Sequence, residues 1–201
     1  MGNDLRTLST SSLTILNNPA VIAVSQDPEG RSAVRIRHDF DVAKDEYGIG
    51  EAHVWSGSLY GGDQVVLFLN AADEDLEMSA TLAEIFLHDG PGGSAPQVKE
   101  AWEVYDLWAN RMDDKLAQKI LDAPEGKAVN SLEQANWYNC TALPYKEGLK
   151  KGDKRLLGKK IGKIEAGGTF TAKVKKHAAE MYRLKSLGTG GKRKVHSKEE
   201  L

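Results

Sequence analysis

Short runs rich in β-branched and aromatic residues recur along most of this chain, with glycine-rich turns between them. Runs of this length are typical of strands, and glycine supplies the positive φ angles that tight turns need. The predicted strands cover residues 33–37, 52–56, 64–70, 76–85, 102–107, 156–164, 169–174 and 180–186. The turn clusters are Gly61-Gly62-Asp63, Gly90-Pro91-Gly92-Gly93 and Gly167-Gly168. This pattern predicts a mainly β fold, an antiparallel β-sandwich, over residues 31–188.

Two short helices are predicted before the first strand, within residues 1–30. Ser9 or Ser11 can cap the first, and Asn18 can cap the second because Pro19 suits the first position of a helix. The apolar residues that would form their buried faces are Leu13, Leu16, Val21, Ile22 and Val24. Two short helices without a sheet cannot make an independent domain, so this segment is predicted to belong to a larger unit.

One further helix is predicted inside the strand region. Met112, Leu116 and Ile120 recur every four residues after Asp113 or Asp114, which indicates a helical insertion near residues 113–122. Residues 189–201 contain Lys192-Arg193-Lys194 and have no apolar periodicity, so they are predicted to form a flexible basic tail.

Charge and hydropathy exclude some classes of partner. The chain has 27 Lys and Arg against 29 Asp and Glu, which gives a formal net charge of −2. This balance provides no overall positive field for nucleic acid or for an acidic membrane surface. The longest apolar run, residues 65–69, is far below the roughly 20 residues that span a bilayer. We therefore expect no nucleic-acid partner and no membrane partner.

The spacing of histidine and cysteine gives little support for metal chemistry. Cys140 is the single cysteine, and the five histidines are scattered without a pair at the helical i, i+4 interval. His38 and Asp39 are adjacent, but consecutive strand residues point to opposite faces, so they predict no catalytic dyad. We expect no cofactor and no metal site.

The acidic residues do not predict a catalytic pair. Glycoside hydrolysis in its usual form needs two carboxyl groups on rigid supports across the scissile bond. The two acidic clusters, Asp73-Glu74-Asp75 and Asp113-Asp114, fall in a turn and at a helix start. Carboxylates at such positions accept hydrogen bonds from the backbone and interact favourably with the helix dipole. No residue of this chain is therefore predicted to be catalytic.

Two other features leave alternatives open. Aromatic side chains could form a platform for sugar rings, although such residues more often belong to a core; they are Trp55, Trp102, Tyr105, Trp108 and Trp137. A non-catalytic carbohydrate-binding or scaffolding β-sandwich module is therefore an alternative function. Asn139-Cys140-Thr141 matches the N-glycosylation pattern, which makes Asn139 a candidate glycosylation site if the protein is secreted.

Several longer motifs resemble glycoside hydrolase family 27, the α-galactosidases and α-N-acetylgalactosaminidases. The first are Met1-Gly2-Asn3-Asp4-Leu5-Arg6 and Val21-Ile22-Ala23-Val24-Ser25-Gln26-Asp27-Pro28. Others are Val54-Trp55-Ser56-Gly57-Ser58-Leu59, Asp63-Gln64-Val65-Val66-Leu67-Phe68-Leu69-Asn70 and Trp102-Glu103-Val104-Tyr105-Asp106-Leu107-Trp108. The resemblance extends to about Gly188, and Asn136-Trp137-Tyr138-Asn139 is similar to the fungal branch. Glu29 departs from the Leu that the family usually has there.

The resemblance implies a fold and an activity. In the family, the opening motif closes the eighth strand of a (β/α)8 barrel, and the next helix leads into a β domain. Residues 1–30 would then be a remnant of the barrel, and residues 31–188 the β-sandwich. The family's nucleophile and acid/base are aspartates on earlier barrel strands, so a retaining α-galactosidase is implied whose catalytic aspartates are not among these residues. Asn3 and Asp4 match the barrel's catalytic end and are candidates for supporting the substrate pocket.

The resemblance also implies a location and partners. The family is secreted, whereas residues 1–6 do not begin a basic and then apolar leader, so the sequence as written predicts a cytoplasmic product. Met1 matches a methionine that is internal in the family, which suggests a truncated gene model or an engineered fragment. The parent enzyme would act on an α-galactoside. Without a barrel, the apolar faces of the first two helices would be exposed, which favours self-association.

Overall fold

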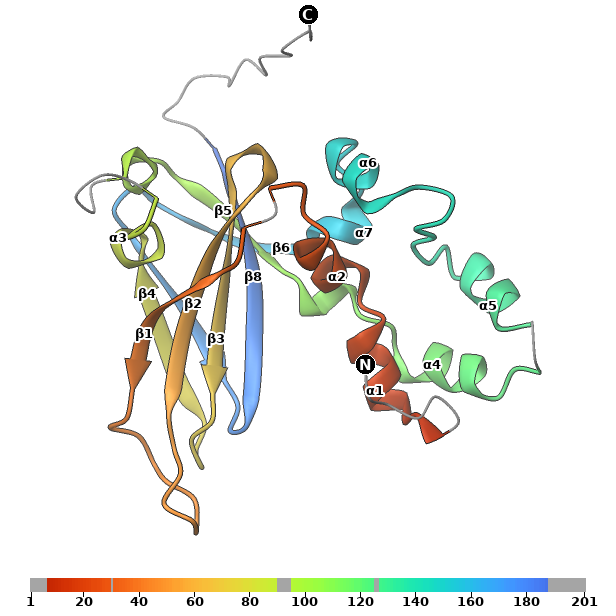
Figure 1. The fold of residues 1–201 in the computed structure, drawn as a ribbon, viewed down its shortest axis with the longest axis horizontal. Helices are drawn as coiled ribbons and strands as arrows, with labels where there is room; N and C mark the ends of the chain where they lie inside the picture. The colour runs from red at the N-terminus through yellow and green to blue at the C-terminus, as the bar shows by residue number, and fades with distance from the viewer. Residues whose placement is uncertain (1–6, 30, 90–94, 125–126, 188–201) are drawn as a thin grey trace, which may run out of the picture.

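The computed structural model describes residues 7–29, 31–89, 95–124 and 127–187, and within them the chain forms two antiparallel sheets (Figure 1). The strands are β1 (Val34–Asp39), β2 (Ala52–Leu59), β3 (Asp63–Asn70), β4 (Leu76–Thr81), β5 (Trp102–Asp106), β6 (Lys159–Ile164), β7 (Thr169–Val174) and β8 (Ala178–Ser186). The larger sheet has the order β1-β2-β3-β8-β5-β6, and β4 pairs with β7 in the smaller one. The predicted class, a mainly β antiparallel sandwich, is confirmed.

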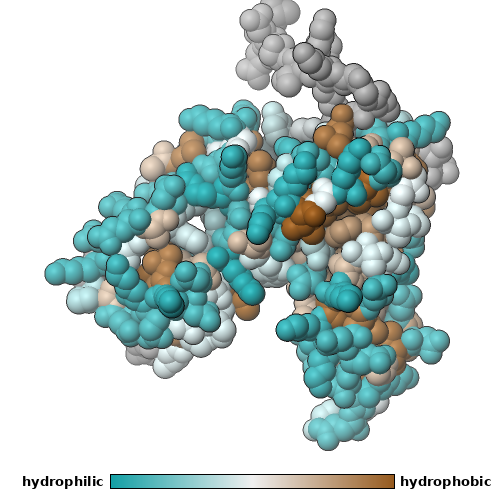
Figure 2. Space-filling view, turned by 180° about the vertical axis from the view of Figure 1, so that it is seen from behind, coloured by the Kyte–Doolittle hydropathy of each residue, from teal (hydrophilic) through white to brown (hydrophobic). Residues whose placement is uncertain are grey.

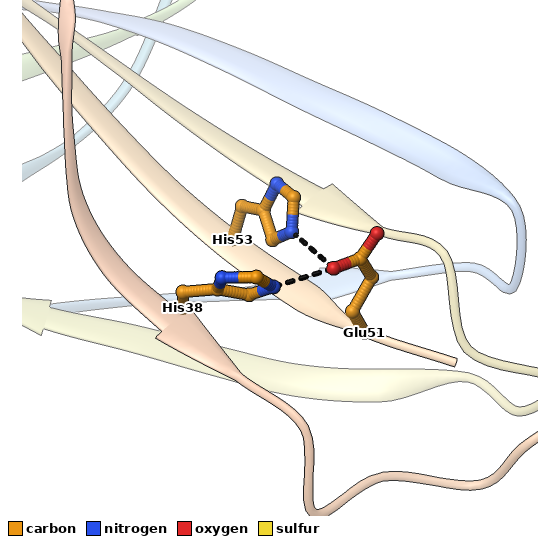
Figure 3. Close-up of side chains that lie close together, drawn as sticks. All are labelled: His38, Glu51 and His53. Atoms are coloured by element: carbon orange, nitrogen blue, oxygen red, sulfur yellow. Dashed lines mark hydrogen bonds and ion pairs between the residues drawn. The ribbon is translucent and has the colours of Figure 1, made fainter. Parts of the chain in front are cut away.

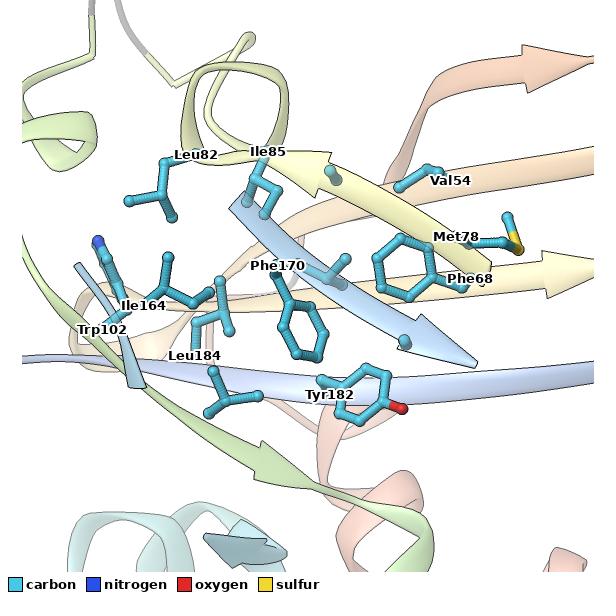
Figure 4. Packing of buried hydrophobic residues seen from close by; sticks show 14 of the residues in the cluster. Val54, Phe68, Met78, Leu82, Ile85, Trp102, Ile164, Phe170, Tyr182 and Leu184 are labelled. Atoms are coloured by element: carbon cyan, nitrogen blue, oxygen red, sulfur yellow. The ribbon is translucent and has the colours of Figure 1, made fainter. Parts of the chain in front are cut away.

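The main hydrophobic core lies between the two sheets. Alternate residues of a strand point to opposite faces. The residues of the larger sheet that face β4 and β7 are buried: Ala52, Val54, Val66, Phe68, Trp102, Val104, Tyr182 and Leu184. From the smaller sheet, Phe170 meets Tyr182 edge to face, with ring centroids 4.7 Å apart. Figure 4 shows Val54, Phe68, Trp102, Phe170, Tyr182 and Leu184 meeting between the sheets. The opposite face of each strand is therefore left for other contacts.

Two predicted strands end earlier or begin later than expected. The segment 76–85 is a strand only to Thr81, because Thr81 caps helix α3 (Leu82–Ile85). The Thr81 hydroxyl accepts a hydrogen bond from Glu84 N at 3.2 Å, and the Glu84 carboxylate accepts one from Thr81 N at 2.8 Å. This reciprocal capping box satisfies two N–H groups that a helix start leaves unpaired. The strand prediction for residues 82–85 is therefore wrong.

The segment predicted as a strand over residues 156–164 begins as a helix. Its first residues form helix α7 (Lys154–Leu157), and the Asp153 side chain caps this helix by accepting a hydrogen bond from Arg155 N. Leu156 in α7 is fully buried. Gly158 then adopts φ +84° and turns the chain into β6. A Cβ at Gly158 would lie 2.5 Å from the carbonyl oxygen of Asp106, so the turn also requires glycine for space. Only residues 159–164 are a strand, as β6.

A helical insertion joins β5 to β6. Its first helix, α4 (Asp114–Leu121), lies where the helix near residues 113–122 is predicted, and Asp113 caps it. The insertion is longer than predicted, because α5 (Ala128–Gln134), α6 (Tyr145–Lys150) and α7 follow. Short 3-10 turns, η2 (Tyr60–Gly62), η4 (Pro96–Lys99) and η5 (Trp108–Asn110), complete the order. In the described parts of the chain, no helix has the length and apolar character needed to cross a bilayer.

Helices α1 (Thr10–Leu16) and α2 (Pro19–Ser25) begin as the sequence predicts, at Ser9 and Asn18. The Asn18 side chain accepts from Ala20 N and also donates to the Leu107 carbonyl at 3.0 Å, which fixes α2 to the sandwich. The expectation that the apolar faces are left exposed is wrong for α2. Val21 and Val24 pack with Leu59, Val65 and Leu107 on the outer face of the large sheet.

Helix α2 also contacts the helical insertion. Ala23 is fully buried beside Tyr138 and Leu156, and Leu143, Tyr145 and Leu149 pack around them. Helix α2 therefore has sheet on one side and α6 and α7 on the other (Figure 1). On α1, Ile15 and Leu16 remain exposed, so the expectation of an exposed apolar face holds for part of that helix.

Gly148 in α6 gives a test of this packing. A Cβ at Gly148 would clash with the Tyr138 hydroxyl and lie 2.7 Å from Leu156 Cδ1. The hydroxyl cannot move freely, because it donates to the Leu143 carbonyl at 2.7 Å. We expect Gly148→Ala to lower the free energy of unfolding by about 1–3 kcal/mol, although alanine favours a helix, because overpacking outweighs propensity. Urea denaturation followed by circular dichroism measures it.

Gly162→Ala is the control for this substitution. Gly162 lies in β6 and has no atom within 4 Å of the position of an added Cβ. Its replacement is expected to change the free energy of unfolding by less than about 0.5 kcal/mol. Equal effects of the two substitutions would contradict the tight contact between α6, Tyr138 and α7.

Candidate functional site

Some predicted site residues lie outside the described part of the chain. Asn3 and Asp4, the candidates for supporting a substrate pocket, are among residues 1–6, and the basic tail falls in residues 188–201. Asn139 is described and is exposed, and its side-chain oxygen accepts hydrogen bonds from Thr141 N at 3.0 Å and Ala142 N at 3.2 Å. Its glycosylation stays a prediction.

The two acidic clusters have the structural roles that the sequence indicates. Asp113 Oδ1 accepts from Leu116 N at 2.7 Å and so caps α4. Asp73 Oδ1 lies 3.2 Å from Lys176 Nζ and 3.4 Å from His177 Nε2. The hydrogen bond and charge of Lys176 lower the pKa of Asp73, with a smaller contribution from His177. Both clusters therefore support turns and caps.

A cleft of about 1100 Å³ lies between the helical part and the start of β8. Figure 2 shows it as a hollow between two lobes. Among its lining residues are four carboxyl groups, those of Asp106, Asp113, Asp114 and Glu180. Burial raises the pKa of Glu180, and the negative charge of Asp106 raises it further. A raised carboxyl pKa is a property of general acids, so this pair is the candidate that an acid–base mechanism would have to use.

The aromatic residues do not form one exposed platform. Trp102 is fully buried in the core and donates its indole N–H to the Gln97 carbonyl at 3.0 Å. Trp108 lines the cleft and donates to the Ala179 carbonyl at 2.8 Å. Trp55 lies on the outer face of the large sheet, with the Arg35 guanidinium 5.9 Å from its ring centroid. Along β5, Trp102 and Val104 face the core, whereas Glu103 and Tyr105 point to the opposite face.

Three titratable side chains meet at the β1–β2 edge: His38, Glu51 and His53 (Figure 3). His38 Nε2 lies 2.5 Å and His53 Nε2 lies 3.1 Å from the same Glu51 oxygen, Oε2. The contacts of its carboxylate with His53 and His38, and the charges of the two imidazoles, lower the pKa of Glu51. Their potential ligand atoms all lie within 4.8 Å of one another. The expectation of scattered histidines therefore fails for His38 and His53.

A β-bulge creates this juxtaposition. Arg35 pairs with Trp55, but the register shifts between Arg35 and Arg37, so His38 faces His53. Without the shift, Arg37 would stand opposite His53. Glu51 precedes His53 by two residues and shares its face. The Glu51-x-His53 spacing was a readable signal, whereas the bulge and the long connection 40–51 left the partner of His53 undetermined.

Residues 49–129 match the family described as the alpha galactosidase C-terminal beta sandwich domain. An α-galactosidase of Zygotorulaspora mrakii is 42% identical over 185 residues, which are 92% of this chain and 38% of that protein. Alpha-galactosidase 2 of Saccharomyces cerevisiae is 40% identical with the same coverage. The chain thus spans about two fifths of the length of the curated relatives that it matches.

Solved structures agree with these sequence matches. The α-galactosidase of Saccharomyces cerevisiae with raffinose superposes with a TM-score of 0.82 at 38% identity, covering 92% of this chain and 39% of that one. The enzyme of Mortierella vinacea, at 22% identity and a TM-score of 0.53, shares the fold. The chain therefore belongs to the α-galactosidases of glycoside hydrolase family 27 and corresponds to their carboxy-terminal portion.

Proposed function

We propose that this chain is the accessory β domain, with adjoining barrel elements, of an enzyme that hydrolyses terminal α-D-galactosyl residues with retention. The observation that carries the proposal is the match to α-galactosidases over 92% of this chain. We further propose that these 201 residues do not hydrolyse α-galactosides by themselves. Retaining cleavage needs two carboxyl groups about 5–5.5 Å apart across the bond, and the family resemblance assigns both to earlier barrel strands.

The contacts of the described carboxylates support this proposal. The Asp113 carboxylate caps helix α4. The Asp73 carboxylate pairs with Lys176. In the cleft, Asp106 Oδ1 accepts a hydrogen bond from Trp108 N at 2.8 Å, so it supports the η5 turn. The raised pKa of Glu180 follows from its burial and from its place beside Asp106. These groups therefore have structural explanations that require no substrate.

The direct test is an assay of the purified 201-residue chain with an aryl α-galactoside. We expect release of the aryl group at the rate of the buffer blank, because no positioned acid–base pair acts on the bond. Glu180→Gln and Asp106→Asn are assayed beside the unaltered chain, since they remove the cleft carboxyl group with a raised pKa and the neighbour whose charge contributes to that rise. A full-length family member serves as the positive control.

Two outcomes distinguish the alternatives. Turnover that is lost on Glu180→Gln or Asp106→Asn would contradict the proposal and place an active site in the cleft. The absence of turnover with saturable galactose binding, measured by calorimetry and weakened by the same substitutions, would favour the carbohydrate-binding module. Cleavage that both substitutions leave unchanged would point to a contaminating enzyme, which a gel-filtration profile of activity identifies.

A further inference from the structure

The cluster of His38, Glu51 and His53 is built by strand register. His38 and His53 are direct partners across the antiparallel β1–β2 pair, and Glu51 lies two residues before His53. Ala52 and Val54 point into the core, so His53 and Glu51 point to the outer face of the large sheet. Cross-strand partners have Cβ atoms about 4.5–5.5 Å apart. Three donor side chains therefore converge on one spot because of backbone pairing.

His53 lacks the hydrogen bonds that a buried imidazole requires. It is 9% exposed, and among the described residues neither Nδ1 nor Nε2 has a well-aligned hydrogen-bond partner. Its Nε2 lies 3.1 Å from Glu51 Oε2, an ion-pair contact without the alignment of a hydrogen bond. A buried polar group without a partner is costly, and buried imidazoles usually donate or coordinate. This side chain is poised toward a ligand that can accept its lone pair.

Two aromatic rings flank the cluster. The Phe40 ring lies on His38, with centroids 3.8 Å apart, and the Trp55 ring centroid is 6.4 Å from that of His53. Phe40 itself is exposed, and the side chains of His38 and Glu51 are partly exposed, so an ion can reach them from solvent. Glu51 presents one carboxylate oxygen to both imidazoles. The edge strand β1 supplies one ligand, so an ion here would join that edge to the rest of the sheet.

We propose that His38, Glu51 and His53 bind a divalent transition-metal ion of the zinc class. Two imidazole nitrogens and one carboxylate are a donor set that zinc accepts, with a water in the fourth position. Zinc–ligand bonds of about 2.0–2.2 Å would separate the ligand atoms by about 3.3 Å. The Glu51 carboxylate and His38 Nε2, now 2.5 Å apart, would have to move apart slightly to admit the ion. The ion would link the edge strand β1 to β2, since His38 comes from one and His53 from the other.

Calorimetric titration of the EDTA-treated, tag-free 201-residue chain with ZnCl2 tests the proposal. We expect one ion per chain at this site and a rise in the thermal unfolding midpoint with added zinc, because the ion binds only the folded register. His53→Gln is expected to weaken zinc binding at least tenfold and to remove the thermal shift. His38→Gln is the second variant, since His38 is less buried and its loss disturbs the fold less.

His177→Asn is the matched control. His177 also lies beside a carboxylate, that of Asp73 at 3.4 Å, and has a φ of +53° that asparagine tolerates. This variant is expected to bind zinc like the unaltered chain. The absence of one-to-one zinc binding in the unaltered chain would overturn the proposal and leave a histidine–glutamate hydrogen-bonded cluster. Binding that His38→Gln and His53→Gln leave unchanged would also overturn it, because the ion would then occupy other residues.

Discussion

Replacing Arg183 with alanine is expected to lower the free energy of unfolding by about 3–5 kcal/mol, the cost of removing one partner of a buried charge network. Arg183 in β8 is 2% exposed, and its guanidinium lies 2.9 Å from Asp63 Oδ2 and 3.4 Å from Asp27 Oδ2. Asp27 follows α2 and Asp63 begins β3, so one side chain joins the first helices to the sheet. Urea denaturation followed by circular dichroism measures the change.

The size of this loss depends on which hydrogen-bond and ion-pair partners Asp27 and Asp63 keep when Arg183 is replaced. Asp27 Oδ1 still accepts from Tyr60 N at 2.7 Å and from Glu29 N at 3.0 Å, which limits the loss on that side. Asp63 keeps Lys185, 3.4 Å away, a weaker and more exposed partner. Lys185→Ala is therefore the control, with an expected loss below about 1 kcal/mol, as for exposed ion pairs. Similar losses from both substitutions would show that burial does not govern this network.

Local signals predicted the parts of the fold whose cause is local. Asn18 before Pro19 predicted the start of α2, and it is found there with its side chain on Ala20 N. The strands are predictable for the same reason, because a run of β-branched and aromatic residues followed by a glycine turn is a signal that spans only a few residues. The Thr81-x-x-Glu84 capping signature is just as local, although the predicted strand 76–85 runs through it. Leu82 and Ile85 are apolar and suit a buried strand or a buried helix, so only the capping residues distinguish the two.

The rest depended on contacts between distant segments. Ala20 and Ala23 read as ordinary helix formers, and only the structure shows that their small size lets α2 fit between the sheet and α7. The His38–His53 contact depends on a bulge whose position no local residue type fixes. The prediction that α2 is exposed is wrong for a related reason, because the outer sheet face on which α2 packs is formed by residues far from it in the sequence.

Trp102 has the largest of the fully buried side chains in the part of the chain that the structure describes. Trp102 in β5 is fully buried, its indole N–H donates to the Gln97 carbonyl, and its ring lies 4.8 Å from that of Phe86. Trp102→Ala should lower the free energy of unfolding by about 3–5 kcal/mol, because a large cavity would open between the sheets. Trp102→Phe keeps an aromatic ring but loses the hydrogen bond, so a smaller loss of about 1–3 kcal/mol is expected. Circular dichroism follows unfolding in urea without relying on the fluorescence of the residue replaced.

Trp55→Ala, on the outer face, separates burial from ring size, since Trp55 is less buried. If Trp102→Ala cost no more than Trp55→Ala, the layer between the two sheets could not be the main source of stability.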